Sequence, residues 1–72
     1  MNTYKVIFAR NVVLSCVIEN HAVLNKEYYY EHDKGQLMYA LINAENEADA
    51  IHKSNKIIRE VTEMIFGNDY II

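Results

Sequence analysis

Three histidines and a single cysteine are the side chains of this 72-residue chain that could bind a transition metal. None of His21, His32 and His52 stands four residues from another histidine or from Cys16. Because zinc sites draw on closely spaced pairs of such ligands, the spacing does not support a metal site, and we expect no cofactor. Cys16 lies within an apolar run, where a free cysteine is typically a small core residue.

The other polar residues do not form a catalytic arrangement either. Asp33 follows His32 directly, and an aspartate in such a segment is typical of a turn rather than of an acid that orients a base. Ser15 and Ser54 stand in apolar stretches without a partner at a suitable spacing, so a nucleophilic triad is not indicated. Two glycines cannot build a phosphate-binding loop. We therefore expect a protein that is not an enzyme, has no catalytic residue and takes no small-molecule substrate.

The charge balance weighs against nucleic acid and membrane partners. The formal net charge is −3, and all of the excess acid lies after residue 43. A protein that binds phosphate groups normally presents a basic face, and the apolar runs are much shorter than the about 20 residues that cross a bilayer. The first residues lack the pattern of a secretory signal. We expect one small domain over residues 1–72, located in the cytoplasm.

Tyrosine is the unusual feature of the composition. The chain has six tyrosines, three of them consecutive at residues 28–30, and only two phenylalanines. Tyrosine offers a large ring with a hydrogen-bonding tip, which is why it is enriched at protein interfaces. The excess therefore points to an interaction surface.

An amphipathic helix is predicted over residues 46–66. A period of 3.6 residues gathers its apolar side chains on one arc, opposite the charged ones. The arc contains Ala50, Ile51, Ser54, Ile57, Ile58, Val61, Met64 and Ile65. Asn46 suits the N-cap, with Asp49 three residues later, and Gly67 suits the position after the last turn. Beyond it, residues 70–72 are expected to add a short edge strand or to contact a partner.

Two β-hairpins are predicted before this helix. Residues 4–8 and 12–18 are rich in β-branched and aromatic side chains, with Arg10 and Asn11 as the turn between them. Residues 26–31 and 36–43 form the second hairpin, and the sequence between them favours a type I turn followed by a residue with positive φ. An alternative remains open, in which residues 20–34 form a helix and the order becomes ββαβα.

The expected fold class is α+β: an antiparallel sheet of about four strands, covered on one face by the C-terminal helix. Alternation along residues 36–44 divides the side chains between the two faces. Toward the helix it places Met38, Ala40, Ile42 and Ala44, and away from it Leu37, Tyr39 and Leu41. One helix cannot cover both faces, so the second face lacks a cover within the chain.

This uncovered face is the predicted functional surface. Three successive tyrosines of one strand cannot all turn to the same side, so at least one ring must point away from the helix. The predicted interface consists of Tyr28, Tyr29, Tyr30, Leu37, Tyr39 and Leu41. We expect a small interaction or regulatory module that self-associates, as a homodimer, through this tyrosine-rich face or binds another protein with it.

The passage from strand to helix at residues 42–51 is similar to junctions in many small strand–helix proteins, HicB-type antitoxins among them. The loop with proline and glycine that is expected of that family is missing, because the chain has no proline. The resemblance implies only that an acidic helix start follows a strand. A nucleic-acid-associated regulator or antitoxin-like module is the alternative function.

Overall fold

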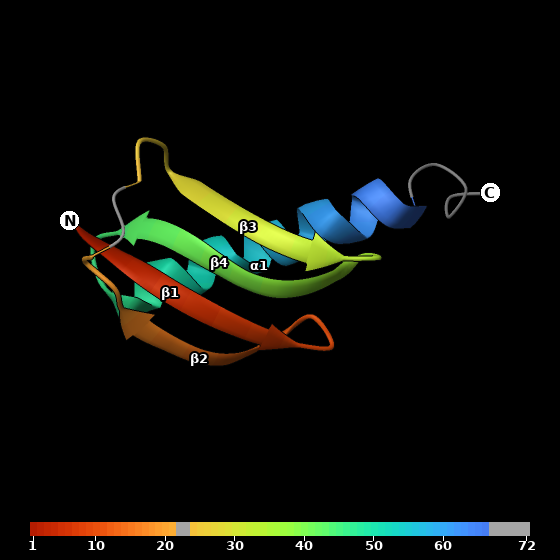
Figure 1. Cartoon of the computed structure of the whole chain (residues 1–72), viewed down its shortest axis with the longest axis horizontal. Coiled ribbons are helices and arrows are strands. Elements are labelled where there is room, and N and C mark those ends of the chain that lie inside the picture. Colours follow the sequence, from red (N-terminus) through yellow and green to blue (C-terminus); the bar gives the residue numbers. More distant parts are fainter. Residues whose placement is uncertain (22–23, 67–72) are drawn as a thin grey trace.

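Two β-hairpins and one long helix make up the part of the chain that the computed structural model describes, residues 1–21 and 24–66 (Figure 1). The elements are β1 (Asn2–Ala9), β2 (Val12–Ile18), β3 (Tyr28–Asp33), β4 (Gln36–Ala44) and α1 (Glu47–Phe66). The strands form one antiparallel sheet in the order β2-β1-β4-β3, so that β2 and β3 are its edges. The α+β prediction is confirmed, and strand β3 rules out a helix over residues 28–33.

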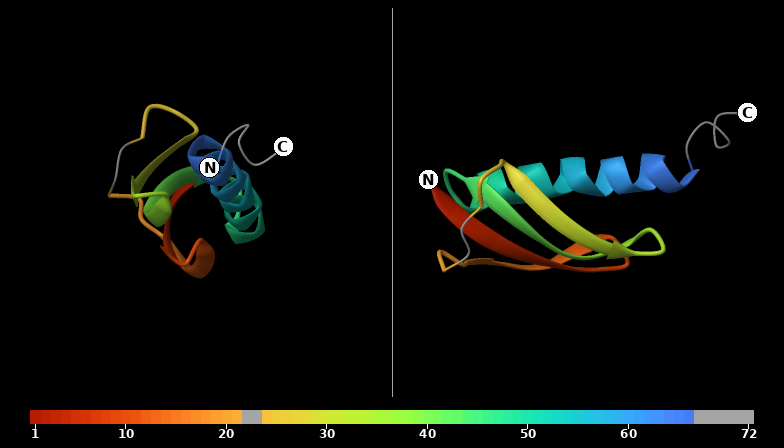
Figure 2. Two further views of the ribbon diagram at one scale, coloured as in Figure 1. Left: turned by 90° about the vertical axis from the view of Figure 1, so that its right-hand side faces the viewer. Right: turned by 45° about the horizontal axis from the view of Figure 1, so that its top comes forward.

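The helix lies on one face of the sheet only. It packs against β4, β2 and β1, and Figure 2 shows it along one side of the curved sheet. Fully buried side chains at this contact come from both layers: Val6, Ala40, Ile42 and Ala44 from the sheet, and Ala50, Ser54, Ile57 and Val61 from the helix. Of the predicted arc, these four residues and Ile58 pack in or against the core, whereas Met64 is 54% exposed. The side chain of Ile65 lies outside the described part of the structure.

Both hairpin turns use left-handed backbone conformations. Arg10 and Asn11 have φ of 54° and 58°, and Lys34 and Gly35 have φ of 53° and 83°. Positive φ at both central residues is typical of the type I′ turn, whose twist matches that of the flanking strands. The prediction of a type I turn over residues 32–35 was wrong, because β3 extends through Asp33 and leaves only two residues for the turn.

Asparagine side chains hold the ends of these elements. The Asn11 amide accepts from the Leu37 N–H (2.8 Å) and donates to the Gly35 carbonyl (3.2 Å), which ties the two turns together. At the start of α1, Asn46 Oδ1 accepts from the Asp49 N–H at 2.8 Å, which confirms Asn46 as the N-cap. The Asp49 carboxylate reaches back to the Glu45 N–H at 3.1 Å.

A β-bulge changes which face two side chains of β4 occupy. Tyr39 pairs with Glu31 and Leu37 with His32, so Met38 is an extra residue on β4. The alternation shifts by one position there, which buries Leu37 and leaves Met38 55% exposed. The prediction that Leu37 lies on the second face and Met38 on the helix face was therefore wrong. Gly67 and residues 70–72, to which a cap and an edge strand were assigned, lie outside the described residues.

Candidate protein interface

The face of the sheet opposite α1 is left uncovered by the described part of the chain. We call it the second face and define it by the side chains of Lys5, Ile7, Val12, Ser15, Val17, Tyr29, Glu31, Tyr39 and Leu41, which the register places together. Tyr29 lies opposite Leu41, and Tyr39 lies opposite Ile7 on one side and Glu31 on the other. Three of the six predicted interface residues, Tyr29, Tyr39 and Leu41, are thus brought together here.

Charged groups on the second face are few and interact with the tyrosines. The Lys5 ammonium lies 5.3 Å from the centre of the Tyr39 ring, and that of Lys26 lies 5.6 Å from the Tyr29 ring. The Tyr29 hydroxyl donates a hydrogen bond to the Glu31 carboxylate. Such cation–π contacts hold the rings in place without removing them from solvent. The surface is therefore aromatic and apolar, and its charged groups are Lys5 on β1, Glu31 on β3 and Lys26 just before β3.

Tyr28 and Tyr30 turn to the helix side instead. Both pack against the core, and their rings stack with centroids 6.2 Å apart. The Tyr28 hydroxyl donates to Glu60 Oε1 of α1 at 2.5 Å. This hydrogen bond, aided by desolvation, raises the pKa of Tyr28 to about 12. Tyr28 and Tyr30, like Leu37, thus do not join the second face, although at least one tyrosine points away from the helix as predicted.

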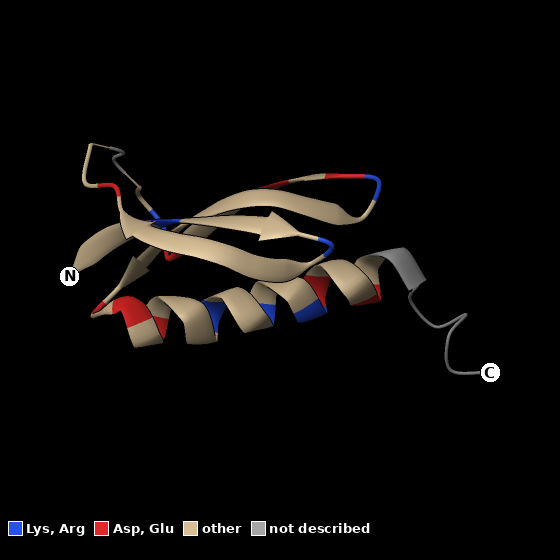
Figure 3. Cartoon of the chain, turned by 90° about the horizontal axis from the view of Figure 1, so that it is seen from below, with Lys and Arg blue, Asp and Glu red and all other residues tan. Residues whose placement is uncertain are grey.

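The β2 edge, Val12–Ile18, carries the largest group of exposed apolar side chains among the described residues. The exposed fractions are 61% for Val12, 66% for Leu14, 54% for Val17 and 55% for Ile18. The strand has no charged residue, so its ribbon stays tan in Figure 3. Its outer side has no neighbouring strand in the described sheet. This edge combines apolar side chains with unpaired backbone groups, the combination that favours pairing with another strand.

The direction of the β2 backbone groups follows from one hydrogen bond. The Glu19 N–H donates to the Thr3 carbonyl at 2.7 Å, which makes Thr3 and Glu19 a hydrogen-bonded pair. Such pairs alternate along an antiparallel ladder, so Val17 turns its amide toward β1. Cys16 and Ile18, at the alternate positions, direct their N–H and C=O groups outward. They are available to a further strand.

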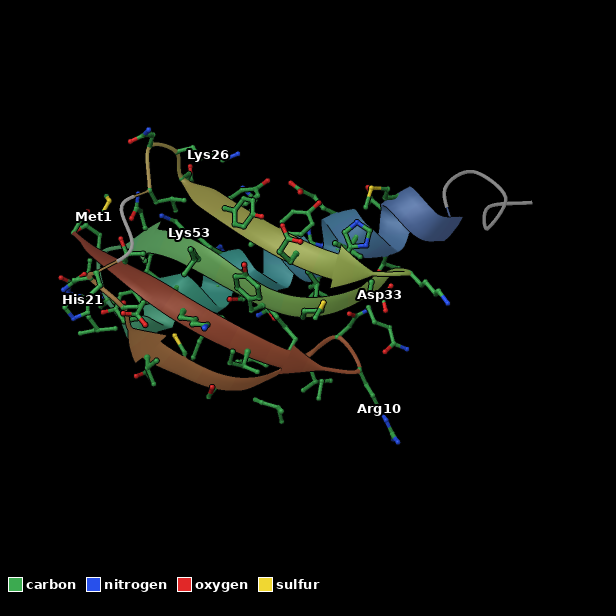
Figure 4. All side chains as sticks on the ribbon, in the orientation of Figure 1. Met1, Arg10, His21, Lys26, Asp33 and Lys53 are labelled. Carbon is green, nitrogen blue, oxygen red and sulfur yellow. The ribbon has the colours of Figure 1, made fainter. Side chains whose placement is uncertain are left out.

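The β3 edge, Tyr28–Asp33, is different. Glu31, His32 and Asp33 are exposed on it, and two of them are acids. Asp33 lies at the far end of the strand beside the turn (Figure 4). Charged side chains on an edge are one of the means by which proteins prevent unwanted strand pairing. This edge is protected by its own sequence.

The described residues also form an open pocket of about 370 Å³ beside the start of α1. Lys53 lines it, but its ammonium already contacts the Asn43 carbonyl at 2.8 Å, Asp49 at 3.5 Å and Glu27 at 3.7 Å. The Asn43 amide in turn donates to the carbonyls of Leu24 and Lys26. These groups hold the segment before β3 against the sheet and the helix, so the Lys53 ammonium has a structural role and is already paired.

The remaining groups with reactive or metal-binding side chains are Cys16, the histidines and the carboxylates. Burial, with a smaller effect of Glu47, raises the pKa of the Cys16 thiol, which disfavours the nucleophilic thiolate. In residues 1–21 and 24–66, no three His, Cys, Asp or Glu side chains lie together in a way that could hold a metal ion. The same part of the chain has no helix with the length and hydrophobicity that a bilayer crossing requires.

The four exposed residues of β2 were missed when the interface was predicted. The β-branched residues predicted the strand, whereas the interface was predicted from the tyrosines and from the alternation along residues 36–44. A signal was nevertheless present: the run VVLSCVI has seven residues, no charge, no glycine and no proline. Segments of this composition pair readily when they are exposed.

Comparison with models of known protein families, with curated proteins and with solved structures finds no match for this chain. Its function is therefore argued from the geometry alone.

Proposed function

We propose that the chain is a small, non-enzymatic protein-interaction module that associates with a second copy of itself through the parts of the sheet that α1 leaves uncovered, the second face and the β2 edge. The observation that carries the proposal is the position of the helix, which packs on one face of a sheet that is apolar on both. A domain of this size obtains only about 3–5 kcal/mol from its single core. Burial against a second copy would add to this stability.

A second copy suits either uncovered part of the sheet. On the second face, Lys5 of β1 and Glu31 of β3 stand on opposite sides of Tyr39 and Leu41, so two stacked copies could bring opposite charges together. Along the β2 edge, the strand has no charge that would oppose pairing with an identical strand.

Solution mass measured by sedimentation equilibrium over a series of micromolar concentrations tests the proposal. We expect a species of twice the 8.4 kDa chain mass that dissociates on dilution. Val17→Lys places a charge on the second face and should shift the protein toward the monomer. The control is Met64→Lys, because Met64 has the same 54% exposure as Val17 but lies at the end of α1. A strictly monomeric wild-type protein would overturn the proposal.

A nucleic-acid-associated or antitoxin-like module receives less support. Exposed tyrosines can stack on bases, but such surfaces also need cations that follow the phosphates. Lys26 lies next to Glu27 in the sequence, and Lys5 shares its face with Glu31. Figure 3 shows acidic residues at the start and toward the end of α1 with basic residues between them, so the helix carries both signs rather than one basic face. A salt-sensitive mobility shift with mixed RNA or DNA would favour this alternative.

A further inference from the structure

We infer that two copies of the chain meet along their β2 edges, joining two four-stranded sheets into one continuous sheet of eight strands. This inference rests on the proposed self-association and specifies where the copies touch. The occupant of the edge is a second β2, paired antiparallel about a twofold axis perpendicular to the sheet. Backbone hydrogen bonds, rather than the stacking of one sheet on another, would form the centre of the contact.

The backbone of β2 has outward N–H and C=O groups that could pair with another strand. Cys16 and Ile18 direct their N–H and C=O groups away from β1, and in the described chain no strand lies beyond them. An unpaired row of this kind is a template for another strand. Antiparallel pairing of two identical strands uses the same groups on both copies, which is the requirement for a closed twofold dimer.

The side chains favour a second copy over other occupants. A strand that pairs with itself about a twofold axis brings its own charges face to face, and like charges opposite one another are destabilising. β2 has no charge at any position, so every register of the pair avoids this repulsion. β3 would place Glu31 and Asp33 near the same residues of the other copy. Of the two edges, only β2 is compatible with its own copy.

The dimer would also bury what the monomer exposes. Leu14 is the extra residue of the bulge between Val13 and Ser15, and it is the most exposed apolar residue of the strand. Ile18 lies opposite Tyr4 and so projects on the helix side, whereas Val17 lies opposite Lys5 on the second face. The contact would therefore bury apolar side chains both on the helix side of the sheet and on the second face. Both second faces then lie on the same side of the joined sheet, with Tyr29 and Tyr39 still accessible to a partner.

Two kinds of variant distinguish edge pairing from stacking of the second faces. Ile18→Lys and Leu14→Lys alter the edge, and Ile18 does not contribute to the second face. Tyr39→Thr removes the central ring of the second face and lies two strands away from the edge. Sedimentation equilibrium gives the dissociation constant of each variant, with Met64→Lys as the matched control. Circular dichroism melting confirms that each variant is folded.

We expect both edge variants to raise the dissociation constant about tenfold or more, because each introduces a charge into the pairing strands. Tyr39→Thr and Met64→Lys should leave it within about twofold of the wild type. If Tyr39→Thr weakens the dimer while the folded Ile18→Lys protein does not, the copies stack and the edge inference is overturned, although the proposed self-association stands. If the wild type is monomeric at all concentrations, both proposals fail.

Discussion

The two edges of the sheet differ in how well they are protected against pairing with another strand. β2 and β3 each expose one row of backbone groups, but β3 carries Glu31 and Asp33 and is anchored to α1 by the hydroxyl of Tyr28. β2 carries no charge and leaves four large apolar side chains in solvent. The same sheet thus has one edge that resists strand pairing and one that favours it.

The difference shows that the residue types of a strand say less about its accessible surface than the contacts that cover those residues. Tyr28 and Tyr30 attract attention in the sequence, yet both pack against the core. Val12 and Val17 look like ordinary strand residues, yet nothing in the described chain covers them. The edges differ because charges and a tie to the helix accompany the apolar residues of one strand and not those of the other.

The largest expected effect is the loss of stability when the core is altered at β4, one of the two strands that lie between the edges. Ile42 is fully buried on β4, and Ile42→Ala should destabilise the protein by about 2–5 kcal/mol through the cavity it leaves. This is comparable with the whole stability expected of so small a domain, so both edges should be lost together. Urea unfolding followed by circular dichroism measures the loss. A fully folded variant with wild-type stability would show that the core does not hold the two hairpins together.

A smaller effect is expected when the protection of β3 is removed. The double variant Glu31→Thr with His32→Val should give β3 an uncharged central segment like that of β2, because Thr and Val favour strands. With two edges that can each pair with another strand, the protein should form assemblies larger than a dimer. Light scattering would detect them. The control is Glu63→Thr with His52→Val, which makes the same substitutions at exposed positions of α1. Equal assembly by both double variants would show that the edge charges do not matter.

The smallest effect concerns the tie between β3 and α1. Tyr28→Phe removes the hydrogen bond to Glu60 and should lower the free energy of unfolding by about 0.5–1 kcal/mol. The pKa of Tyr28 is raised in the folded protein, so this stabilisation is present below pH 10 and is lost as the pH rises from 10 to about 12. Melting curves across this range should converge for the wild type and the variant.

Absorbance titration of tyrosinate gives an independent check of that tie. Subtracting the titration of the Tyr28→Phe variant from that of the wild type isolates the hydroxyl of residue 28. It should ionise near pH 12. Ionisation near pH 10 would mean that the bond to Glu60 does not form in solution.

The local elements were predictable because local patterns determine them. The run of β-branched residues predicted β2 with the bounds that the structure has, and the 3.6-residue period with Asn46 as cap predicted α1 to within one residue. The uncovered second face followed from simple geometry, since one helix can cover only one side of a sheet. That at least one of the three consecutive tyrosines points away from the helix followed from the alternation of side chains along a strand, and Tyr29 is that residue.

What could not be predicted depends on contacts between distant residues. The pairing of β1 with β4 brings together residues that are 32 to 42 positions apart, from Ile7 with Tyr39 to Asn2 with Ala44, and no periodicity within either strand indicates it. The bulge at Met38 reversed the orientation of Leu37, because a single inserted residue shifts the alternation. Asn11 looked like an ordinary turn residue, and its link to the second turn exists only once the hairpins are adjacent.

Hydrogen exchange at the outward amides of the two edges tests the central claim most directly. By the same alternation, Tyr28 and Tyr30 direct their amides outward on β3, as Cys16 and Ile18 do on β2, since the Asn43 N–H donates to the Glu27 carbonyl. NMR can follow these amides at low and high protein concentration. Exchange at Cys16 and Ile18 should slow as the concentration rises, while exchange at Tyr28 and Tyr30 stays unchanged. Exchange that is independent of concentration on both edges would contradict the account.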